Sequence, residues 1–315
     1  MKMEWYIGID GGGTKTEFLL RRENGTVLGR IRKGSADYRE IGLDGVGEMV
    51  CRGIQELLAE YGKQPEDVCC ACMGMPNFSE IPENDAYIKK WLEKHWTKFP
   101  IYLVNDVLVG WAGALALKPG IHLVAGTGAI AIGVKNPHQY IRCGGWHNRF
   151  SDEGSGYWLG IETMRLFTKE ADGRRAKGAL YELIKAEFEI TEDTEDMKVV
   201  DIWEKEYLPY RDRTASLQLI LKKAAEQGDL AAKELYWEAG KELAEMVRSL
   251  YSRMPSLSSP VLVSKSGGIF RATELLWESL KEHTGDLSIC WQEPAYEPAE
   301  GAAILAQEFW KEETE

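Results

Sequence analysis

The sequence lacks the features that mark nucleic-acid-binding, membrane and secreted proteins. Its 315 residues contain no lysine- or arginine-rich block, and the formal net charge is −12. Nucleic acids are bound through clustered cations, so we expect no nucleic-acid partner. No apolar run approaches the roughly 20 residues of a membrane span, and the first residues do not resemble a secretory signal. We therefore expect no membrane partner.

Cysteine is also scarce, with six residues in the whole chain. A chain of this length can bury a sizeable core without disulfides, so we expect reduced thiols and a cytoplasmic location. The only dense group is Cys69-Cys70-Ala71-Cys72, and no second pair at ligand spacing lies nearby. We interpret it as part of a buried strand in preference to a metal or cluster site.

Both common phosphate-binding loops are missing as well. A Walker loop and a dinucleotide fingerprint each lead into a helix, whereas the glycines at 11–13 follow an apolar run and lead into a second one. The amides of such a turn can form an anion nest, with Thr14, Lys15 and Thr16 as further donors. Asp10, directly before the glycines, is a candidate ligand for a metal ion that accompanies phosphates. The alternative is a tight hairpin without a ligand.

Strands and helices alternate along the chain, which indicates the α/β class. From apolar periodicity and turn residues we expect strands at 5–9, 16–20, 26–32, 68–73, 101–104, 121–125, 129–134, 261–263 and 287–291. We expect helices at 45–61, 85–95, 107–118, 161–253 with breaks near 191–196 and 228–229, 269–280, and from about 300 onward.

An internal repeat is the main clue to the domain organisation. A strand, a glycine-rich turn and another strand occur first around Gly11, Gly12 and Gly13, and again around Gly126-Thr127-Gly128. Two such halves facing each other would place both turns on the walls of one cleft. We place the domain break near 117–120, so that one domain covers 1–117 and a second covers 118–299 with a helical insertion. The helix at about 300–315 is a candidate to pack back on the first domain.

The order of these motifs resembles the sugar kinase, Hsp70 and actin superfamily, and within it the N-acetylglucosamine kinase branch that contains the BadF/BadG/BcrA/BcrD ATPases. The run from Asp10 to Thr16 resembles the first phosphate motif, and Gly126, Thr127 and Gly128 resemble the second. Gly267 and Gly268 stand where the adenosine motif is expected. The resemblance covers nearly the whole chain. It implies two RNase H-like (actin-like ATPase) domains, each with a mixed five-stranded sheet, around a central cleft for nucleotide and sugar.

The resemblance also implies a reaction, in which ATP with Mg²⁺ phosphorylates the 6-hydroxyl group of N-acetylglucosamine or a close relative. Asn105-Asp106, at the end of a strand, is similar to the pair that holds the catalytic aspartate. Asp106 is therefore the candidate general base, because phosphoryl transfer needs a base near the acceptor hydroxyl. Its alternative role is to cap the helix that starts at Val107.

The segment 144–160 resembles the sugar-binding loop of this family. Trp146 could stack on a sugar or pack the loop, and we leave both open. Asp152 with Glu153 could instead form an acid pair of a glycosidase, ligands of a second metal, or a solvated turn; the resemblance favours Asp152 as an acceptor for sugar hydroxyls. The candidate sugar contacts are Asp37, Asn105, Gly145, Trp146 and Asp152.

Two departures from the family pattern concern the substrate. Asp37 stands where asparagine is frequent, and a carboxylate there would favour an ammonium over an N-acetyl group, so glucosamine stays open. Arg149, together with His147, follows the Gly-Trp pair of the loop. A cation there suggests a carboxylate-bearing sugar such as N-acetylmuramic acid; a surface arginine paired with a nearby acid is the simpler alternative.

Two alternative functions were also compared with the sequence. An activator ATPase of 2-hydroxyacyl-CoA dehydratases needs cysteines for a shared cluster, but 126–134 contains none and Cys143 stands alone. An inactive sugar sensor would have lost the base or the phosphate glycines, and the sequence keeps both. We expect a homodimer, with the acidic C-terminal helix either solvated or at its interface.

Overall fold

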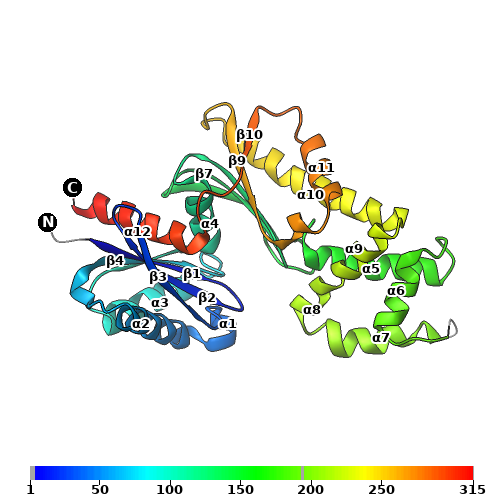
Figure 1. Cartoon of the computed structure of the whole chain (residues 1–315), viewed down its shortest axis with the longest axis horizontal. Helices are drawn as coiled ribbons and strands as arrows, with labels where there is room; N and C mark the ends of the chain where they lie inside the picture. Colours follow the sequence, from blue (N-terminus) through cyan, green and yellow to red (C-terminus); the bar gives the residue numbers. More distant parts are fainter. Residues whose placement is uncertain (1–3, 193–194, 315) are drawn as a thin grey trace. The chain divides into compact units, whose positions relative to one another are not determined.

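The computed structural model describes residues 4–192 and 195–314. The chain forms two compact units, each built on its own five-stranded sheet (Figure 1). The first unit contains the described residues up to His122, together with 134–140 and the chain from Trp291 onward; the second contains 123–133 and 141–290. The expected α/β class with two mixed five-stranded sheets is confirmed. The first unit extends a few residues beyond the expected break at 117–120.

The sheet of the first unit has the strand order β3-β2-β1-β4-β5. Strands β1 (Trp5–Gly11), β2 (Thr16–Arg22) and β3 (Val27–Lys33) form an antiparallel meander. Strands β4 (Val68–Met75) and β5 (Ile101–Asn105) run parallel to β1. The carboxyl ends of β1, β4 and β5 therefore lie at one edge of the sheet, which is the edge where α/β sheets carry their ligands.

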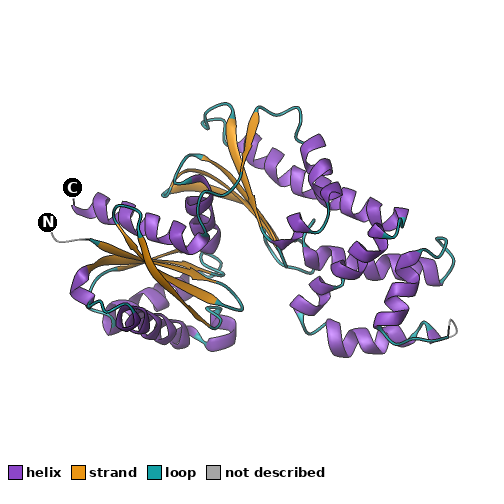
Figure 2. Ribbon diagram, in the orientation of Figure 1, coloured by secondary structure: helices purple, strands orange, loops and turns teal. Residues whose placement is uncertain are grey.

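Helices cover both faces of this sheet (Figure 2). The short helix α1 (Tyr38–Ile41), α2 (Leu43–Glu60) and α3 (Pro82–His95) lie on one face. Helices α4 (Asp106–Leu115) and α12 (Pro298–Thr314) pack together on the other face.

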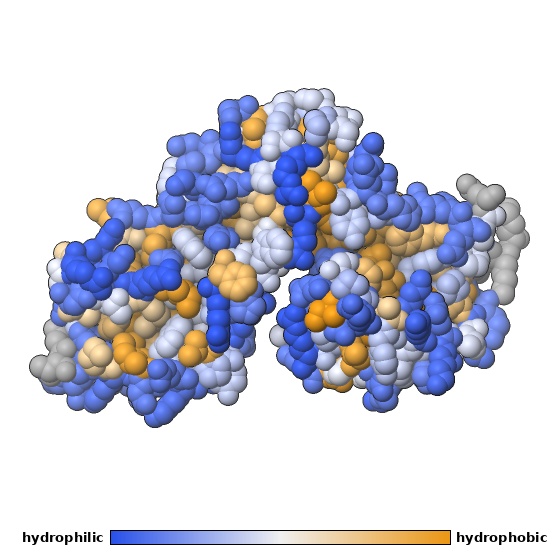
Figure 3. Space-filling view, turned by 180° about the vertical axis from the view of Figure 1, so that it is seen from behind, coloured by the Kyte–Doolittle hydropathy of each residue, from blue (hydrophilic) through white to orange (hydrophobic). Residues whose placement is uncertain are grey.

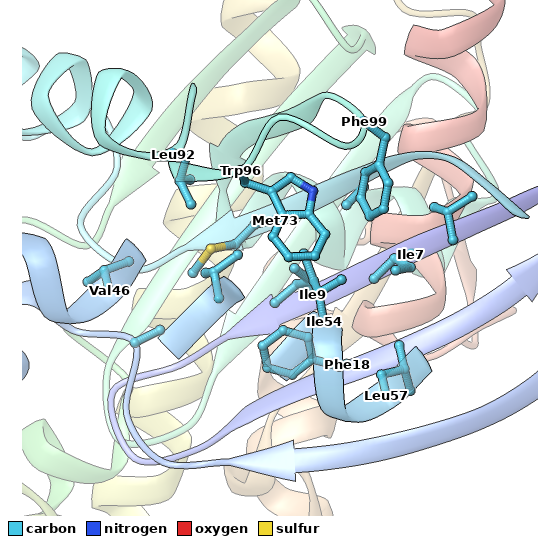
Figure 4. Packing of buried hydrophobic residues seen from close by; sticks show 14 of the residues in the cluster. Ile7, Ile9, Phe18, Val46, Ile54, Leu57, Met73, Leu92, Trp96 and Phe99 are labelled. Atoms are coloured by element: carbon cyan, nitrogen blue, oxygen red, sulfur yellow. The ribbon is translucent and has the colours of Figure 1, made fainter. Parts of the chain in front are cut away.

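The main core of the first unit fills the space between the sheet and α2 and α3 (Figure 4). Ile7 and Ile9 lie two residues apart on β1, so both point to the same face. There they meet Phe18 from β2 and Ile54 from α2, all without exposed surface. Burying a side chain of this size contributes roughly 1.5–3 kcal/mol to the stability of the folded state. Cys70 and Cys72 on β4 are also buried, and burial raises the pKa of both thiols.

A nearly buried ion pair ties the C-terminal helix to this sheet. The Arg21 Nε atom on β2 lies 3.4 Å from Glu300 Oε1 on α12. The Nη1 atom of Arg21 also donates to Gln307 Oε1 at 3.1 Å. Helix α12, red in Figure 1, thus packs with α4 over β1, β2 and β4.

The sheet of the second unit has the order β10-β9-β6-β7-β8. Its strands are β6 (Gly120–Ala125), β7 (Ala129–Asn136), β8 (Gln139–Gly144), β9 (Val261–Ser266) and β10 (Ile289–Gln292). Strand β8 is absent from the sequence-based expectations. It lies at the sheet edge, where half-buried side chains leave only a weak alternation of apolar residues.

The helices of the second unit break more often than expected between 161 and 253. The expected break at 228–229 is confirmed, since Asp229 accepts a hydrogen bond from the Ala232 amide and caps the following helix. The break near 191–196 falls partly on residues 193 and 194, outside the described residues. The helical elements are α5 (Gly156–Ala171), α6 (Ala179–Glu187), α7 (Lys198–Ile202), the π-helix Trp203–Tyr207, α8 (Arg211–Ser216), α9 (Gln218–Glu226), α10 (Leu230–Arg253) and α11 (Glu274–Glu282).

The surface is predominantly hydrophilic on the face shown in Figure 3. Among the helices within 4–192 and 195–314, none combines the length and the apolar character that crossing a membrane requires.

Candidate functional site

Two aspartates stand at the carboxyl edge of the first sheet. Asp10 is near the end of β1, and Asp106 directly follows β5 as the first residue of α4. The helix cap is Asn105, whose Oδ1 atom accepts a hydrogen bond from the Val107 amide at 3.0 Å. The alternative role of Asp106 as the cap is therefore wrong. Because Asn105 also donates to the carbonyl of Phe78 at 3.0 Å, both polar ends of its side chain are used within the protein.

Both aspartates have pKa values above the ordinary range of a carboxyl group. Burial is the main cause for each. The negative charge of Glu17 adds to the effect at Asp10 and raises its pKa to about 6. The negative charge of Asp10 adds to the effect at Asp106 and raises its pKa to about 7. Near neutral pH, Asp106 can therefore exchange a proton with a partner group, as a general base must.

The first glycine turn is held in place by hydrogen bonds around it. The Gly12 amide donates to the carbonyl of Lys15 at 3.0 Å, and the Ala36 amide donates to that of Gly12 at 2.9 Å. Thr16 is fully buried, and its hydroxyl donates to the Gly34 carbonyl at 2.8 Å. Its side chain thus anchors the turn. The exposed members of the turn are Gly13, Thr14 and Lys15.

Asp37 lies at the N-terminus of α1, and one of its oxygens has two donors. Asp37 Oδ1 accepts from the Arg39 amide at 2.8 Å and from Asn77 Nδ2 at 3.0 Å. Asn77, which has a φ of 63°, follows β4 at the same sheet edge as Asp10. The sequence analysis missed Asn77. Its position just after a strand that runs parallel to β1 is the signal that could have found it.

The second glycine turn, residues 126–128, joins β6 to β7 in the second unit. Its carbonyls face the start of α5, because the Gly156 amide donates to Gly126 at 2.8 Å and the Tyr157 amide donates to Thr127 at 3.0 Å. Gly267 lies against the residue before the turn. It has a φ of 108°, and a Cβ atom there would stand 2.0 Å from the Ala125 carbonyl oxygen, so only glycine fits. The second and third predicted glycine motifs are thus brought together.

Asp152 of the predicted sugar loop also belongs to this cluster. Its side chain is only 4% exposed. The Ala129 amide donates to its Oδ1 atom at 3.3 Å, and Arg211 Nη2 donates to its Oδ2 atom at 2.5 Å. Its burial contradicts the alternative of a solvated turn. Arg211 itself, 59 residues further along the chain, carries no motif and was missed by the sequence analysis.

Trp146 projects from the same loop into solvent. It is 75% exposed, and the guanidinium of Arg142 lies 5.5 Å from the centre of its ring. Arg142 also donates to the carbonyls of Gly144 and Gly145, two residues with positive φ that form the bend before the tryptophan. The indole therefore does not pack into the loop, and it stays a candidate for stacking on a sugar.

A pocket of about 480 Å³ adjoins this loop within the second unit. Its lining includes Arg149, Ser151 and Glu153 of the loop, and Tyr157, Trp158 and Arg165 of α5. Arg165 pairs with Glu162. Arg149 forms no ion pair with a carboxylate of the described residues. The simpler alternative for Arg149, a surface pairing with a nearby acid, is therefore wrong in this structure.

The fold has counterparts among solved structures. The crystal structure of an assigned N-acetylglucosamine kinase from Chromobacterium violaceum superposes with a TM-score of 0.76 at 23% sequence identity, over 98% of this chain and all of that one. A likeness at this identity shows the fold.

Sequence comparison then establishes the family. A model of the BadF/BadG/BcrA/BcrD ATPase family matches residues 7–306, and the chain belongs to this family. The N-acetylmuramic acid/N-acetylglucosamine kinase of Clostridium acetobutylicum is 27% identical over 280 residues, which cover 89% of this chain and 90% of that protein. The N-acetyl-D-glucosamine kinase of Dictyostelium discoideum is 26% identical over 97% of this chain and 98% of that protein.

Proposed function

We propose that the protein is an amino-sugar kinase, which transfers the terminal phosphoryl group of ATP to the 6-hydroxyl of N-acetylglucosamine or a close relative. The observation that carries this proposal is the state of Asp106. It follows a strand at the ligand edge of the sheet, the neighbouring asparagine provides the helix cap in its place, and its pKa is raised to about 7. A carboxylate in this state suits proton abstraction from a sugar alcohol. The names of the two kinases compared above support the substrate class.

The two units supply different parts of the reaction in this proposal. In the first, Asp106 acts as the base, Asp37 and Asn77 accept and donate hydrogen bonds to the sugar, and the turn at 11–15 binds phosphate. In the second, the turn at 126–128 and the glycines at 267–268 bind the nucleotide. Phosphoryl transfer can use groups of these kinds, since it relies on positioning and charge stabilisation with little covalent chemistry by the protein.

A magnesium ion fits the residues of the first unit. Asp10 offers a carboxylate beside the first phosphate turn, and the repulsion between buried acids there would fall when a cation binds. Within the described residues, no group of three or more His, Cys, Asp or Glu side chains is arranged to hold a metal alone. Asp10 would therefore hold Mg²⁺ together with water and phosphate oxygens, and the ion would neutralise phosphate charge.

A screen of ADP release tests the proposal. Glucose, glucosamine, N-acetylglucosamine, N-acetylmannosamine and N-acetylmuramic acid are compared as acceptors, and we expect the highest kcat/KM for an N-acetylated amino sugar. Asp106→Asn should lower kcat by a factor of about 10² or more, with unchanged secondary structure. If no sugar stimulates ADP release, the proposed function is refuted. If Asp106→Asn turns over at a nearly normal rate, the role of Asp106 as the base is refuted.

N-acetylmuramic acid is a second candidate substrate, because of Arg149. The Arg149 side chain lines the pocket beside the sugar loop and forms no ion pair with the described residues. A guanidinium in this place can bind the lactyl carboxylate of that sugar. We expect Arg149→Ala to raise KM for N-acetylmuramic acid about tenfold while KM for N-acetylglucosamine changes little. An equal loss for both sugars would exclude this role.

A further inference from the structure

Arg211 is a cation of the helical insertion that contacts the proposed sugar-binding loop. It is the first residue of α8, and its Nη2 atom lies 2.5 Å from Asp152 Oδ2. The Asp152 side chain is 4% exposed, whereas that of Arg211 is 51% exposed. The carboxylate is therefore fixed inside the unit, while the guanidinium reaches it from the surface on a long side chain that has room to move.

The same guanidinium lies against the second glycine turn. A Cβ atom placed on Gly128 would stand 2.3 Å from Arg211 Nη2 and 2.9 Å from Asp152 Oδ2. The turn and the loop are held together by the amides at the start of α5, which donate to the carbonyls of the turn. Arg211 thus contacts the acid of the sugar loop and the backbone of the phosphate turn at once, and all of these groups belong to the second unit.

Both oxygens of Asp152 have a donor in this arrangement. The Ala129 amide occupies Oδ1, and Arg211 occupies Oδ2. A sugar hydroxyl that approaches Asp152 Oδ2 competes with the guanidinium for this oxygen, because the Ala129 amide and the buried surroundings leave little other access to the carboxylate. An arginine displaced from there remains beside the turn at 126–128, and its planar group can form two parallel hydrogen bonds to a phosphate.

We propose that Arg211 is a phosphate-contacting residue that Asp152 holds back until the sugar binds. This inference rests on the proposed kinase function. When a sugar hydroxyl occupies Asp152 Oδ2, the guanidinium turns to the terminal phosphates at the turn and stabilises the charge that develops during transfer. Arg211 forms no covalent bond in this step: the terminal phosphoryl group passes from ATP to the sugar oxygen, ADP leaves, and the proposed base takes up the hydroxyl proton.

The competing explanation is that Arg211 is a permanent counter-ion for a buried acid. In that case its removal leaves an uncompensated charge, so sugar binding weakens and the fold is destabilised, while turnover at saturating sugar stays the same. If Arg211 has the proposed role, its removal lowers kcat and leaves the affinity for the sugar unweakened. It also requires the two substrates to bind cooperatively, because the sugar frees a ligand for the nucleotide.

The test uses the full chain with Arg211→Ala, Arg211→Lys and the matched control Arg213→Ala. Arg213 lies two residues further on and pairs with Glu206 at 3.6 Å, both exposed, so its loss should leave kinetics unchanged. Calorimetry gives the Kd of N-acetylglucosamine without nucleotide. It also gives the Kd of a non-hydrolysable ATP analogue with and without the sugar, and steady-state assays give kcat and KM.

For Arg211→Ala we expect kcat to fall by about 10² to 10³, as for the loss of a transition-state donor. The Kd of the sugar should not rise, because a competitor for Asp152 has been removed. In the wild type the sugar should tighten binding of the analogue about fivefold or more, and this effect should vanish in Arg211→Ala and return in part in Arg211→Lys.

Two results would overturn the inference for Arg211. One is a raised sugar Kd with kcat within about threefold of the wild type, and the other is unchanged cooperativity between sugar and analogue in Arg211→Ala. Both presuppose a wild type that phosphorylates the sugar. A wild type without sugar-dependent ADP release refutes the proposed kinase function itself, and the role of Arg211 with it.

Discussion

Replacing Asp106 by asparagine should make the protein more stable at alkaline pH while it lowers kcat by a factor of about 10² or more. Burial, together with the charge of Asp10, raises the pKa of Asp106 from 3.8 to about 7. One pKa unit corresponds to about 1.4 kcal/mol, so the ionised carboxylate costs the folded state up to about 4 kcal/mol. Because Asp106 keeps partial access to solvent, we expect a gain of about 2–3 kcal/mol on its removal.

The sign of the effect depends on pH. An acid with a higher pKa in the folded than in the unfolded state destabilises the fold only where the unfolded chain is ionised. Below about pH 4 both states carry the proton and the cost is absent; it grows as the pH rises toward 7 and is complete above that. The thermal midpoint of Asp106→Asn should therefore exceed that of the wild type by roughly 5–10 °C at pH 8, and the difference should shrink steadily toward pH 4.5.

Thermal unfolding in a series of buffers, with a chelator and without nucleotide, measures this difference. Asp201→Asn serves as the control, since the Asp201 side chain is 68% exposed and pairs with Lys205 at the surface; its midpoint should follow the wild type at every pH. A lower midpoint for Asp106→Asn at pH 8, or a difference that does not vary with pH, would show that the buried charge is not the source of the effect.

Three further predictions concern the base, the second glycine turn and the C-terminal helix. The kcat/KM for the sugar should fall about tenfold per pH unit below pH 7, because only the ionised base accepts a proton; a profile that is flat between pH 5.5 and 7 would contradict this. Gly128→Ala should lower the melting temperature by a few degrees, because its Cβ would stand 2.9 Å from Oδ2 of the buried Asp152, whereas Gly126→Ala, where a Cβ meets no atom within 4 Å, should melt like the wild type. Glu300→Ala should reduce the free energy of unfolding by about 3 kcal/mol, since it leaves Arg21 charged and nearly buried; a loss below about 1 kcal/mol in denaturant titrations would show that water replaces the carboxylate.

The elements that the sequence predicted are those whose signal is local. The meander β1–β2–β3 follows from apolar runs separated by glycines and by Asn24-Gly25, and α2 follows from apolar residues at helical spacing. The short strand β8 and the extra helix breaks in the insertion were not predicted, because apolar residues recur only weakly in partly exposed segments.

The candidate site shows the same division between local and distant signals. The glycine turns and the Asn105-Asp106 pair could be recognised by their order along the chain. Thr16 was expected as a further donor to a phosphate; it lies on the same face of β2 as Phe18 and Leu20, is buried, and donates its hydroxyl to the Gly34 carbonyl. The contact between Asp152 and Arg211 was not foreseeable, because it joins residues 59 positions apart and depends on how α8 packs on α5.

The position of α12 has a consequence for biosynthesis. The strands that it covers leave the ribosome before the second unit, and the helix leaves after it. During translation one face of the N-terminal sheet, including Leu19 beneath Ala299 and Ala303, therefore stays uncovered while the whole second unit is made. Nascent chains of this protein should be clients of chaperones that bind apolar surface, and a C-terminal truncation should damage the half of the molecule that was synthesised first.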